Sequence, residues 1–230
     1  MVFEDLPYNV AYGAAEHPNY KKRSIMNDNM SDEEFRKFMD STFKAMHPYL
    51  LPGCMLYICM SAKEFGNMKN ILEDNGYHWS TTIIWSKDTA VLSRSDYHQR
   101  MEQIFYGWDA SAPRLHPLDD RTQNNVWEIK RPKKSELHPT QKSIELVVKA
   151  IKNSSNIKNI VLDLFGGSGT TLIACVDTER YCRMMELDPK YVDVIVKRYI
   201  DKVGSDADVF VLRDSKNMMY SDIMVEQVVV

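Results

Sequence analysis

The feature that most constrains this 230-residue chain is an apolar run that ends in a glycine-rich turn. Residues 160–164 (Ile-Val-Leu-Asp-Leu) have the apolar, β-branched character of a strand that is buried on both faces of a parallel sheet. In residues 166–169 (Gly-Gly-Ser-Gly), the missing Cβ atoms let the backbone turn tightly and approach a ligand. Residues 170–175 then have the pattern of a helix with an apolar face. Strand, glycine turn and helix in this order predict a nucleotide-type crevice at the carboxyl end of a strand.

The residues around this turn indicate which ligand the crevice binds. The turn lacks the Gly-Lys-Ser/Thr of a phosphate-binding loop and the G-x-G-x-x-G spacing of dinucleotide-binding proteins. Asp163 would repel a pyrophosphate but can accept hydrogen bonds from an ammonium group. Glu186 ends a second expected strand (residues 180–185), at the position where a ribose diol is bound. S-adenosylmethionine fits these residues, although a tight turn in another α/β fold explains this motif alone equally simply.

Composition and charge limit the classes of function. The formal net charge is −3, so a nucleic-acid surface has to be a local basic patch. A chain of this length can bury the core of one domain, and we expect a single domain over residues 1–230. No apolar run is long enough to cross a bilayer and no signal-peptide pattern opens the chain, so we expect a cytoplasmic protein. The four cysteines lack C-x-x-C spacing, which favours buried, reduced thiols and no metal site.

Asp5, Leu6, Pro7 and Tyr8 form a second motif near the start of the chain. They follow an expected strand so short that we infer a missing upstream segment. Pro7 fixes its own φ and pushes Leu6 toward an extended conformation. The Asp5 carboxylate and the Leu6 carbonyl would then face outward as two acceptors beside the Tyr8 ring, and together they can hold an exocyclic amino group on a planar base. Taken alone, an ordinary strand-to-turn transition is the simpler interpretation.

Taken together, the two motifs resemble those of the amino-group DNA methyltransferases, which make N6-methyladenine or N4-methylcytosine. That family has a D-P-P-Y catalytic tetrad and a D-x-F-x-G-S-G-T-T cofactor motif. Residues 138–142 (His-Pro-Thr-Gln-Lys) and 185–191 (Met-Glu-Leu-Asp-Pro-Lys-Tyr) resemble two further motifs of the family. The order, with the tetrad first and the cofactor motif late, resembles the β class, a circular permutation of the common methyltransferase layout. The resemblance implies a Rossmann-like α/β sheet, S-adenosylmethionine as cofactor and DNA as partner.

The resemblance also assigns roles to individual residues. It implies that the catalytic tetrad is Asp5, Leu6, Pro7 and Tyr8. The expected cofactor-binding residues are Asp28, His138, Thr140, Lys142, Asp163, Phe165, Gly166, Gly167, Ser168, Gly169, Thr170 and Glu186. Among these, we expect Asp163 to bind the ammonium group of the cofactor and Lys142 to pair with its carboxylate.

The tetrad implies a direct transfer to a base that is flipped out of the duplex. We expect Tyr8 to stack on the base, and Asp5 and the Leu6 carbonyl to orient its amino group. An Asp-led tetrad that ends in Tyr favours adenine, with N4 of cytosine as the alternative. Leu6 stands where the family usually has proline, so a weakened or inactive DNA-binding module is a further alternative. A protein-glutamine methyltransferase would have the reversed motif order, and a nicotinamide-dependent oxidoreductase would leave Asp5 unexplained.

Basic side chains near these motifs are expected to contact DNA phosphates. They are Lys21, Lys22, Arg23, Arg94, Arg114, Arg121, Lys130, Arg131, Lys133 and Lys134. Residues 109–125 lack periodicity and lie where β-class enzymes carry a target-recognition region, although a plain surface loop is equally consistent with them. Because that segment is very short, we expect recognition to draw on a second copy of the chain or on a missing domain.

Alternating strands and helices elsewhere predict a mainly parallel sheet. The expected helices begin at a capping box at residues 31–34, at a second capping box at residues 61–64, at residue 143 and at Pro189; the other expected strands are 54–60, 78–85, 103–108, 126–129 and 208–212.

Overall fold

The computed structural model describes residues 1–10, 26, 28–91, 96–132 and 141–226, which form a mixed α/β fold. Its elements are β1 (Val2–Asp5), α1 (Asp32–Met46), a short 3₁₀ helix (His47–Tyr49), β2 (Met55–Met60), α2 (Phe65–Asp74), β3 (Tyr77–Val91), β4 (Gln99–Asp109), β5 (Val126–Glu128), α3 (Ile144–Ser154), β6 (Ile160–Asp163), α4 (Thr170–Thr178), β7 (Tyr181–Met184), α5 (Pro189–Val203), β8 (Phe210–Arg213), β9 (Lys216–Met219) and α6 (Tyr220–Glu226). No helix of the described part is long and apolar enough to span a membrane.

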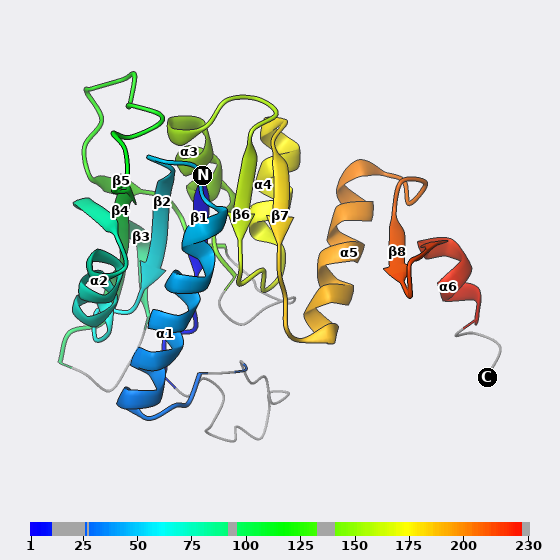
Figure 1. Ribbon diagram of the computed structural model, residues 1–230, viewed down its shortest axis with the longest axis horizontal. Coiled ribbons are helices and arrows are strands. Elements are labelled where there is room, and N and C mark those ends of the chain that lie inside the picture. The colour runs from blue at the N-terminus through cyan, green and yellow to red at the C-terminus, as the bar shows by residue number, and fades with distance from the viewer. Residues whose placement is uncertain (11–25, 27, 92–95, 133–140, 227–230) are drawn as a thin grey trace.

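Seven strands form one sheet in the order β5-β3-β4-β2-β1-β6-β7. The strand β1 pairs in parallel with β2 on one side and with β6 on the other. The strand β4 is antiparallel to both of its neighbours. Because the chain leaves β1 toward β2 and leaves β6 toward β7, the sheet changes its winding direction between β1 and β6 (Figure 1). The carboxyl ends of β1 and β6 therefore meet at the kind of switch point where α/β sheets bind ligands.

Alternate side chains of the central strands build a core on each face of the sheet. Val2 and Leu56 belong to the cluster under α1 and α2, whereas Phe3 and Tyr57 belong to the cluster under α3 and α4. Figure 1 shows the two pairs of helices on opposite faces. Both faces of the central strands are thus covered, which explains why their sequences are almost continuously apolar.

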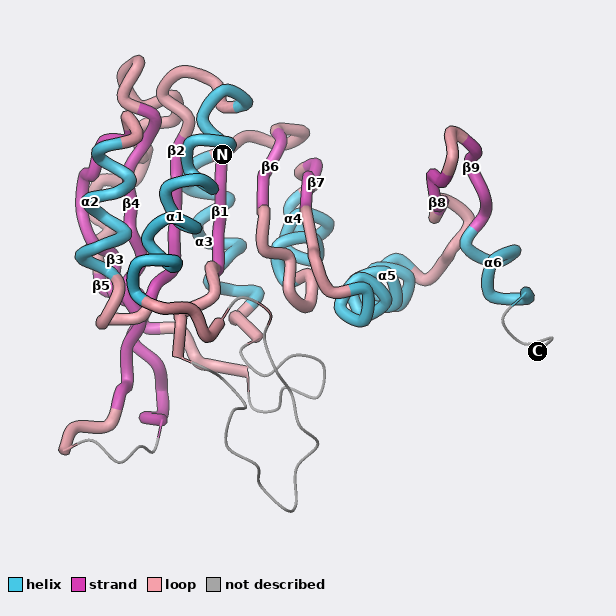
Figure 2. The backbone as a smooth tube through the Cα atoms, turned by 60° about the horizontal axis from the view of Figure 1, so that its bottom comes forward, coloured by secondary structure: helices cyan, strands magenta, loops and turns pink. Residues whose placement is uncertain are grey.

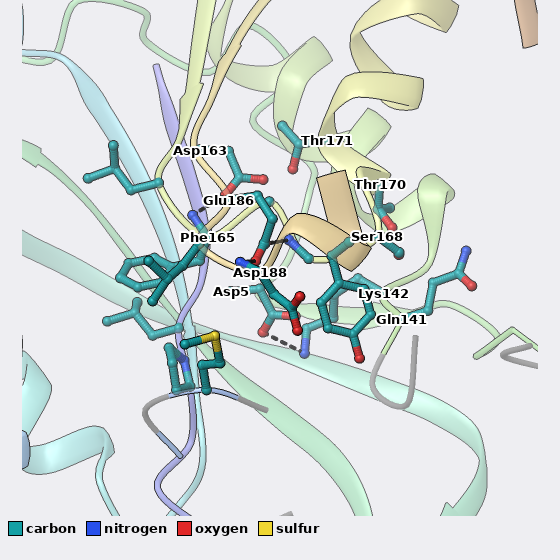
Figure 3. A pocket seen from close by; sticks show the side chains of 18 of the residues that line it. Asp5, Gln141, Lys142, Asp163, Phe165, Ser168, Thr170, Thr171, Glu186 and Asp188 are labelled. Atoms are coloured by element: carbon teal, nitrogen blue, oxygen red, sulfur yellow. Dashed lines mark hydrogen bonds and ion pairs between the residues drawn. The ribbon is translucent and has the colours of Figure 1, made fainter. Parts of the chain in front are cut away.

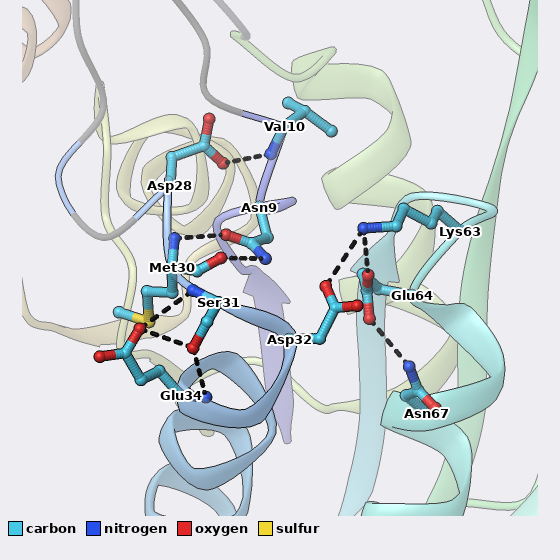
Figure 4. A network of polar contacts seen from close by, with 10 residues as sticks. All are labelled: Asn9, Val10, Asp28, Met30, Ser31, Asp32, Glu34, Lys63, Glu64 and Asn67. Carbon is cyan, nitrogen blue, oxygen red and sulfur yellow. Dashed lines mark hydrogen bonds and ion pairs between the residues drawn. The ribbon is translucent and has the colours of Figure 1, made fainter.

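The first helix begins at the predicted capping box. The Ser31 hydroxyl accepts a hydrogen bond from the Glu34 backbone N–H at 3.3 Å, and the Glu34 carboxylate accepts one from the Ser31 N–H at 3.0 Å (Figure 4). The second predicted capping box is wrong. Helix α2 begins after Glu64 without a side-chain cap, and the Glu64 carboxylate instead lies 3.2 Å from Lys63 and 3.0 Å from Asn67.

The end of the chain departs from the sheet. A strand is present near residues 208–212, as expected, but this strand, β8, pairs with β9 and lies apart from the seven-stranded sheet (Figure 2). Helix α5 connects the two parts and begins at the predicted proline, with Asp188 as its N-cap. The strand β7 therefore forms an edge of the sheet among the described residues.

Gly107 of β4 offers a test of the sheet geometry. A Cβ atom at Gly107 would collide with the backbone carbonyl oxygen of His78, so we expect Gly107→Ala to lower the free energy of unfolding by about 1–3 kcal/mol. Gly66→Ala is the matched control, because a Cβ atom there meets no atom within 4 Å; its stability should equal or exceed that of the wild type. Denaturant unfolding measures both values, and equal effects of the two substitutions would contradict this geometry.

Candidate active site

The switch point between β1 and β6 contains a cavity of about 250 Å³. It brings together most of the residues predicted from the two motifs (Figure 3). The predicted residues that line it are Asp5, Leu6, Pro7, Tyr8, Asp28, Lys142, Asp163, Phe165, Gly166, Gly167, Ser168, Thr170 and Glu186. Gly169 is the N-cap of α4 and is not among the lining residues, and His138 and Thr140 lie outside the described residues. The cavity is also lined by Gln141, Leu187, Asp188 and Tyr191, which belong to the two further motifs but were not expected individually as site residues, and by Thr171.

The glycine turn is shaped by close backbone contacts. A Cβ atom at Gly166 would lie 2.6 Å from the Met184 sulfur and 3.1 Å from the Met185 carbonyl oxygen, so a larger residue there would require the Met184 side chain to move. Gly167 has a φ of +53°, in the left-handed region that glycine adopts readily. The Gly167 N–H donates to the Glu186 carboxylate at 2.6 Å, and the Asp188 N–H donates to the same carboxylate at 2.8 Å. Two backbone donors thus fix Glu186 at the edge of the cavity.

Two buried carboxyl groups lie under the turn. Asp163 accepts a hydrogen bond from the Phe165 N–H at 2.9 Å, and burial raises the pKa of Asp163 to about 7. Glu4 accepts from the Leu164 N–H at 2.9 and 3.1 Å, and it ties β1 to the end of β6. Burial, followed by the nearby Asp163, raises the pKa of Glu4 well above its usual value. Sequence reasoning missed Glu4, although an acidic residue inside an apolar strand was a usable signal.

The tetrad follows β1 directly, as predicted. The Leu6 side chain is buried among the core residues beneath α1, so the leucine that departs from the family pattern has a packing site. The Tyr8 hydroxyl donates to Glu102 at 2.9 Å, and Asp5 pairs with Lys142 at 2.9 Å. Burial raises the pKa of Asp5, and the ammonium of Lys142 opposes that rise.

Lys142 lies on the tetrad side of the cavity, where residues of the protein already bind its ammonium group. Its ammonium pairs with Asp5 at 2.9 Å and Glu102 at 2.8 Å and donates to the Tyr8 hydroxyl at 2.8 Å. Burial would lower the pKa of Lys142, but the two carboxylates outweigh burial and raise it. The structure thus gives Lys142 other partners than the cofactor carboxylate expected from the resemblance.

The segment after the tetrad is attached to the start of α1. Asn9 donates its side-chain amide to the Met30 carbonyl at 3.0 Å and accepts from the Met30 N–H at 2.8 Å (Figure 4). The Val10 N–H lies 3.4 Å from the buried carboxylate of Asp28. These contacts place Asp28 in the cavity wall, as the resemblance implies.

The charges of the cavity identify the kind of ligand that it can hold. Among the described residues, five acidic ones line it: Asp5, Asp28, Asp163, Glu186 and Asp188. The one basic residue in this described part of the wall, Lys142, is already paired with carboxylates. Such a wall disfavours a pyrophosphate and favours a ligand that carries positive charge and hydroxyl groups. The donor and acceptor set therefore fits S-adenosylmethionine better than a nicotinamide dinucleotide.

The expected target-recognition segment, residues 109–125, lies at the other edge of the sheet. The Leu115 N–H donates to the Gly53 carbonyl, which precedes β2, at 2.8 Å. The cavity lies at the carboxyl ends of the parallel strands, and the six residues of β2 separate the two edges by about 20 Å. Residues 109–125 therefore begin at the opposite edge of the sheet from the cavity, and the roles of this segment and of Arg114 and Arg121 in DNA recognition stay predictions.

Other predicted DNA-contacting residues lie closer to the cavity edge. Lys130 and Arg131 are exposed and follow β5, whose carboxyl end lies at the same edge as that of β3. The Arg131 N–H donates to Asp88, which lies near the carboxyl end of β3, at 3.1 Å. Outside the described residues lie Lys21, Lys22, Arg23, Arg94, Lys133 and Lys134.

Solved structures share this architecture. M1.HpyAVI in complex with SAM superimposes with a TM-score of 0.64 at 24% identity, covering 86% of this chain and 87% of that one. The cytosine-N4-specific PvuII DNA methyltransferase superimposes with a TM-score of 0.69 at 15% identity, covering 90% and 80% of the two chains. At these identities, the likeness supports the fold.

Sequence comparison identifies relatives and the family. The Type II methyltransferase M.HpaI of Haemophilus parainfluenzae is 25% identical over 86% of this chain and 67% of its own length. For two other Type II methyltransferases, the aligned part is 46% of their length. A family model described as DNA methylase, for enzymes of the N6/N4 amino-methyltransferase type, matches residues 1–197. The chain therefore belongs to the N6/N4 DNA methylase family.

Proposed function

We propose that this chain transfers a methyl group from S-adenosylmethionine to the exocyclic amino group of a flipped DNA base, with N6 of adenine as the target. One observation carries the proposal: a single cavity is lined by the Asp5–Tyr8 tetrad and by the acidic wall around Asp163 and Glu186. Membership of the N6/N4 DNA methylase family supports the class of reaction. Asp5 at the first position and Tyr8 at the last favour adenine, and N4 of cytosine is the second candidate because a fold neighbour is named cytosine-N4-specific.

The cofactor half of the site consists of oriented acceptors. Asp163 would bind the ammonium group, and Glu186, held by two backbone N–H groups, would accept hydrogen bonds from the ribose hydroxyls. Both Glu186 oxygens have lone pairs beyond the bonds they already accept. When bound, S-adenosylmethionine supplies an electrophilic methyl group on a positively charged sulfur. The acidic wall favours that charge in the cavity.

The tetrad half of the site would orient the base. The Tyr8 ring stacks on the flipped base, while the Asp5 carboxylate and the Leu6 carbonyl accept hydrogen bonds from its amino group. These bonds localise the nitrogen lone pair and direct it toward the methyl carbon. As the new nitrogen–carbon bond forms, the sulfur–methyl bond would break and its electron pair would stay on the sulfur of the departing thioether, S-adenosylhomocysteine. The nitrogen would lose one proton, which the Asp5 carboxylate would accept. Lys142 favours the charged form of Asp5 that this role requires.

DNA would approach the edge of the sheet at which the cavity opens. We propose Lys130 and Arg131 as phosphate contacts, because both are exposed beyond the carboxyl end of β5. We also propose that a second copy of the chain contributes to sequence recognition.

Asp5→Asn tests the reaction and the catalytic residue together. Asparagine keeps the shape of Asp5 but replaces one acceptor by a donor, so we expect kcat to fall about 100-fold or more. The measurement is transfer of labelled methyl from S-adenosylmethionine to unmethylated DNA, followed by nucleoside analysis. Asp177→Asn on α4, whose carboxylate pairs with Lys202 on α5, is the matched control and should keep wild-type activity.

Each outcome of this assay has a distinct meaning. Labelled N6-methyladenine from the wild type and its loss in Asp5→Asn would support the proposal. Labelled N4-methylcytosine would keep the mechanism and contradict the choice of base. Binding of cofactor and DNA without any labelled product would contradict methyl transfer and favour an inactive DNA-binding module.

Asp163 predicts how cofactor affinity depends on pH. Burial raises the pKa of Asp163 to about 7. At pH 6, Asp163 is therefore protonated in most molecules and cannot form an ion pair with an ammonium group. We expect the affinity for S-adenosylmethionine to rise as pH increases through about 7 and then to level off. Asp163→Asn should bind more weakly and with a flatter pH dependence. Isothermal titration calorimetry between pH 5.5 and 8.5 measures the affinity of both proteins for S-adenosylmethionine. The same pH dependence of affinity in both would contradict the role of Asp163.

A further inference from the structure

Glu102 is a half-buried acid that belongs to neither the tetrad nor the cofactor motif. It lies on β4, opposite Trp85 of β3, and its side chain is 18% exposed. One carboxylate oxygen, Oε2, accepts from the Tyr8 hydroxyl at 2.9 Å and pairs with the Lys142 ammonium at 2.8 Å. The other, Oε1, pairs with Lys87. Both oxygens of Glu102 are thus engaged, and two of its three partners touch or belong to the tetrad.

Lys142 connects Glu102 to the acid of the tetrad. Its ammonium has three donors, and it meets Asp5, Tyr8 and Glu102 at 2.9, 2.8 and 2.8 Å. Three acceptors in different directions fix the position of the nitrogen. The position of the Asp5 carboxylate therefore depends on the position of Glu102, which a strand of the sheet holds.

We propose that Glu102 is a positioning residue for methyl transfer and acts through Tyr8 and Lys142. This inference rests on the proposed function. Glu102 restrains the hydroxyl end of the ring that stacks on the base, and through Lys142 it restrains the carboxylate that binds the amino group. Precise alignment matters, because a displacement of about 1 Å can cost roughly 100-fold in rate.

The charges of this network explain how it can be buried. Asp5 and Glu102 carry two negative charges, and Lys87 and Lys142 carry two positive charges, in alternating contact. Burial would raise the pKa of Glu102, but the two ammonium groups outweigh burial and lower it to about 2. Glu102 is thus charged throughout the working pH range. Lys87, at the end of the network away from Asp5, is held by a further contact: the Arg100 side chain donates to the Lys87 backbone carbonyl at 2.8 Å.

The test compares wild type, Glu102→Gln and Glu102→Asp in the labelled-methyl assay on unmethylated DNA. Glutamine keeps the shape of Glu102 but has one acceptor oxygen and no charge, so we expect kcat to fall about 10- to 100-fold at saturating cofactor and DNA. The affinity for S-adenosylmethionine should change less than about twofold, because the contacts of Glu102 are on the tetrad side of the cavity. This split between turnover and binding would not follow from a purely structural role.

Two further variants keep the test decisive. Glu73→Gln is the matched control, since it removes a carboxylate that pairs with Lys69 on α2 at 2.5 Å, away from the cavity; its kcat should equal that of the wild type. Glu102→Asp keeps the charge but withdraws the carboxylate by one methylene group, so an intermediate kcat and a melting temperature near that of the wild type are expected. The aspartate variant decides the question if the glutamine variant does not fold.

The outcomes separate this inference from the proposed function. A wild-type protein that transfers no methyl group would contradict both. Methyl transfer by the wild type with unchanged kcat in the folded Glu102 variants would overturn the role of Glu102 alone. A loss of cofactor affinity as large as the loss of kcat would also overturn it, because Glu102 would then act on binding rather than on alignment.

Discussion

The pairing of β1 with β6 is the constraint on which the rest of the site depends. The two strands share a short register around Val2 and Leu162, and the Leu162 N–H donates to the Met1 carbonyl at 3.0 Å. The Glu4 carboxylate adds two contacts to the Leu164 N–H, which begins the glycine turn. Because the tetrad follows β1 and the turn follows β6, this one junction sets the relative position of both halves of the cavity. A shift in this register would separate them.

The two halves treat buried charge differently. On the tetrad side, the carboxylates of Asp5 and Glu102 meet the ammonium groups of Lys142 and Lys87, so charge is balanced within the protein. On the cofactor side, no basic residue of the described cavity wall pairs with Asp163, and burial raises the pKa of Asp163 to about 7. That imbalance costs free energy, and a cationic ligand would relieve it. The balanced half would orient the base, and the unbalanced half would bind the cofactor.

Sequence patterns predicted the local structure well where one segment contains the whole signal. The capping box at Ser31 and the proline at the start of α5 mark helix starts that the structure has. The capping box expected at Ser61 failed, because residues 61–64 form a turn before α2 and the Glu64 side chain bonds to Lys63 and Asn67. The location of residues 109–125 could not be read from their composition, because the antiparallel direction of β4 places the start of this segment at the edge of the sheet opposite the cavity.

The sequence by itself determined most of the elements before Arg213, the two motifs and their order, because strand–turn–helix signals and the special backbone needs of glycine and proline are local. It also carried the residues that identify the family. Only the tertiary structure decided which motif residues meet, because strand order and direction depend on contacts between distant segments. Glu4 and Glu102 are the clearest cases: each looks like one acid in an apolar or mixed strand, and only pairing with β6 or with β3 and β2 brings it to the site. For the same reason, the partners of Lys142 could not be inferred from its motif, since two of them lie on β1 and β4.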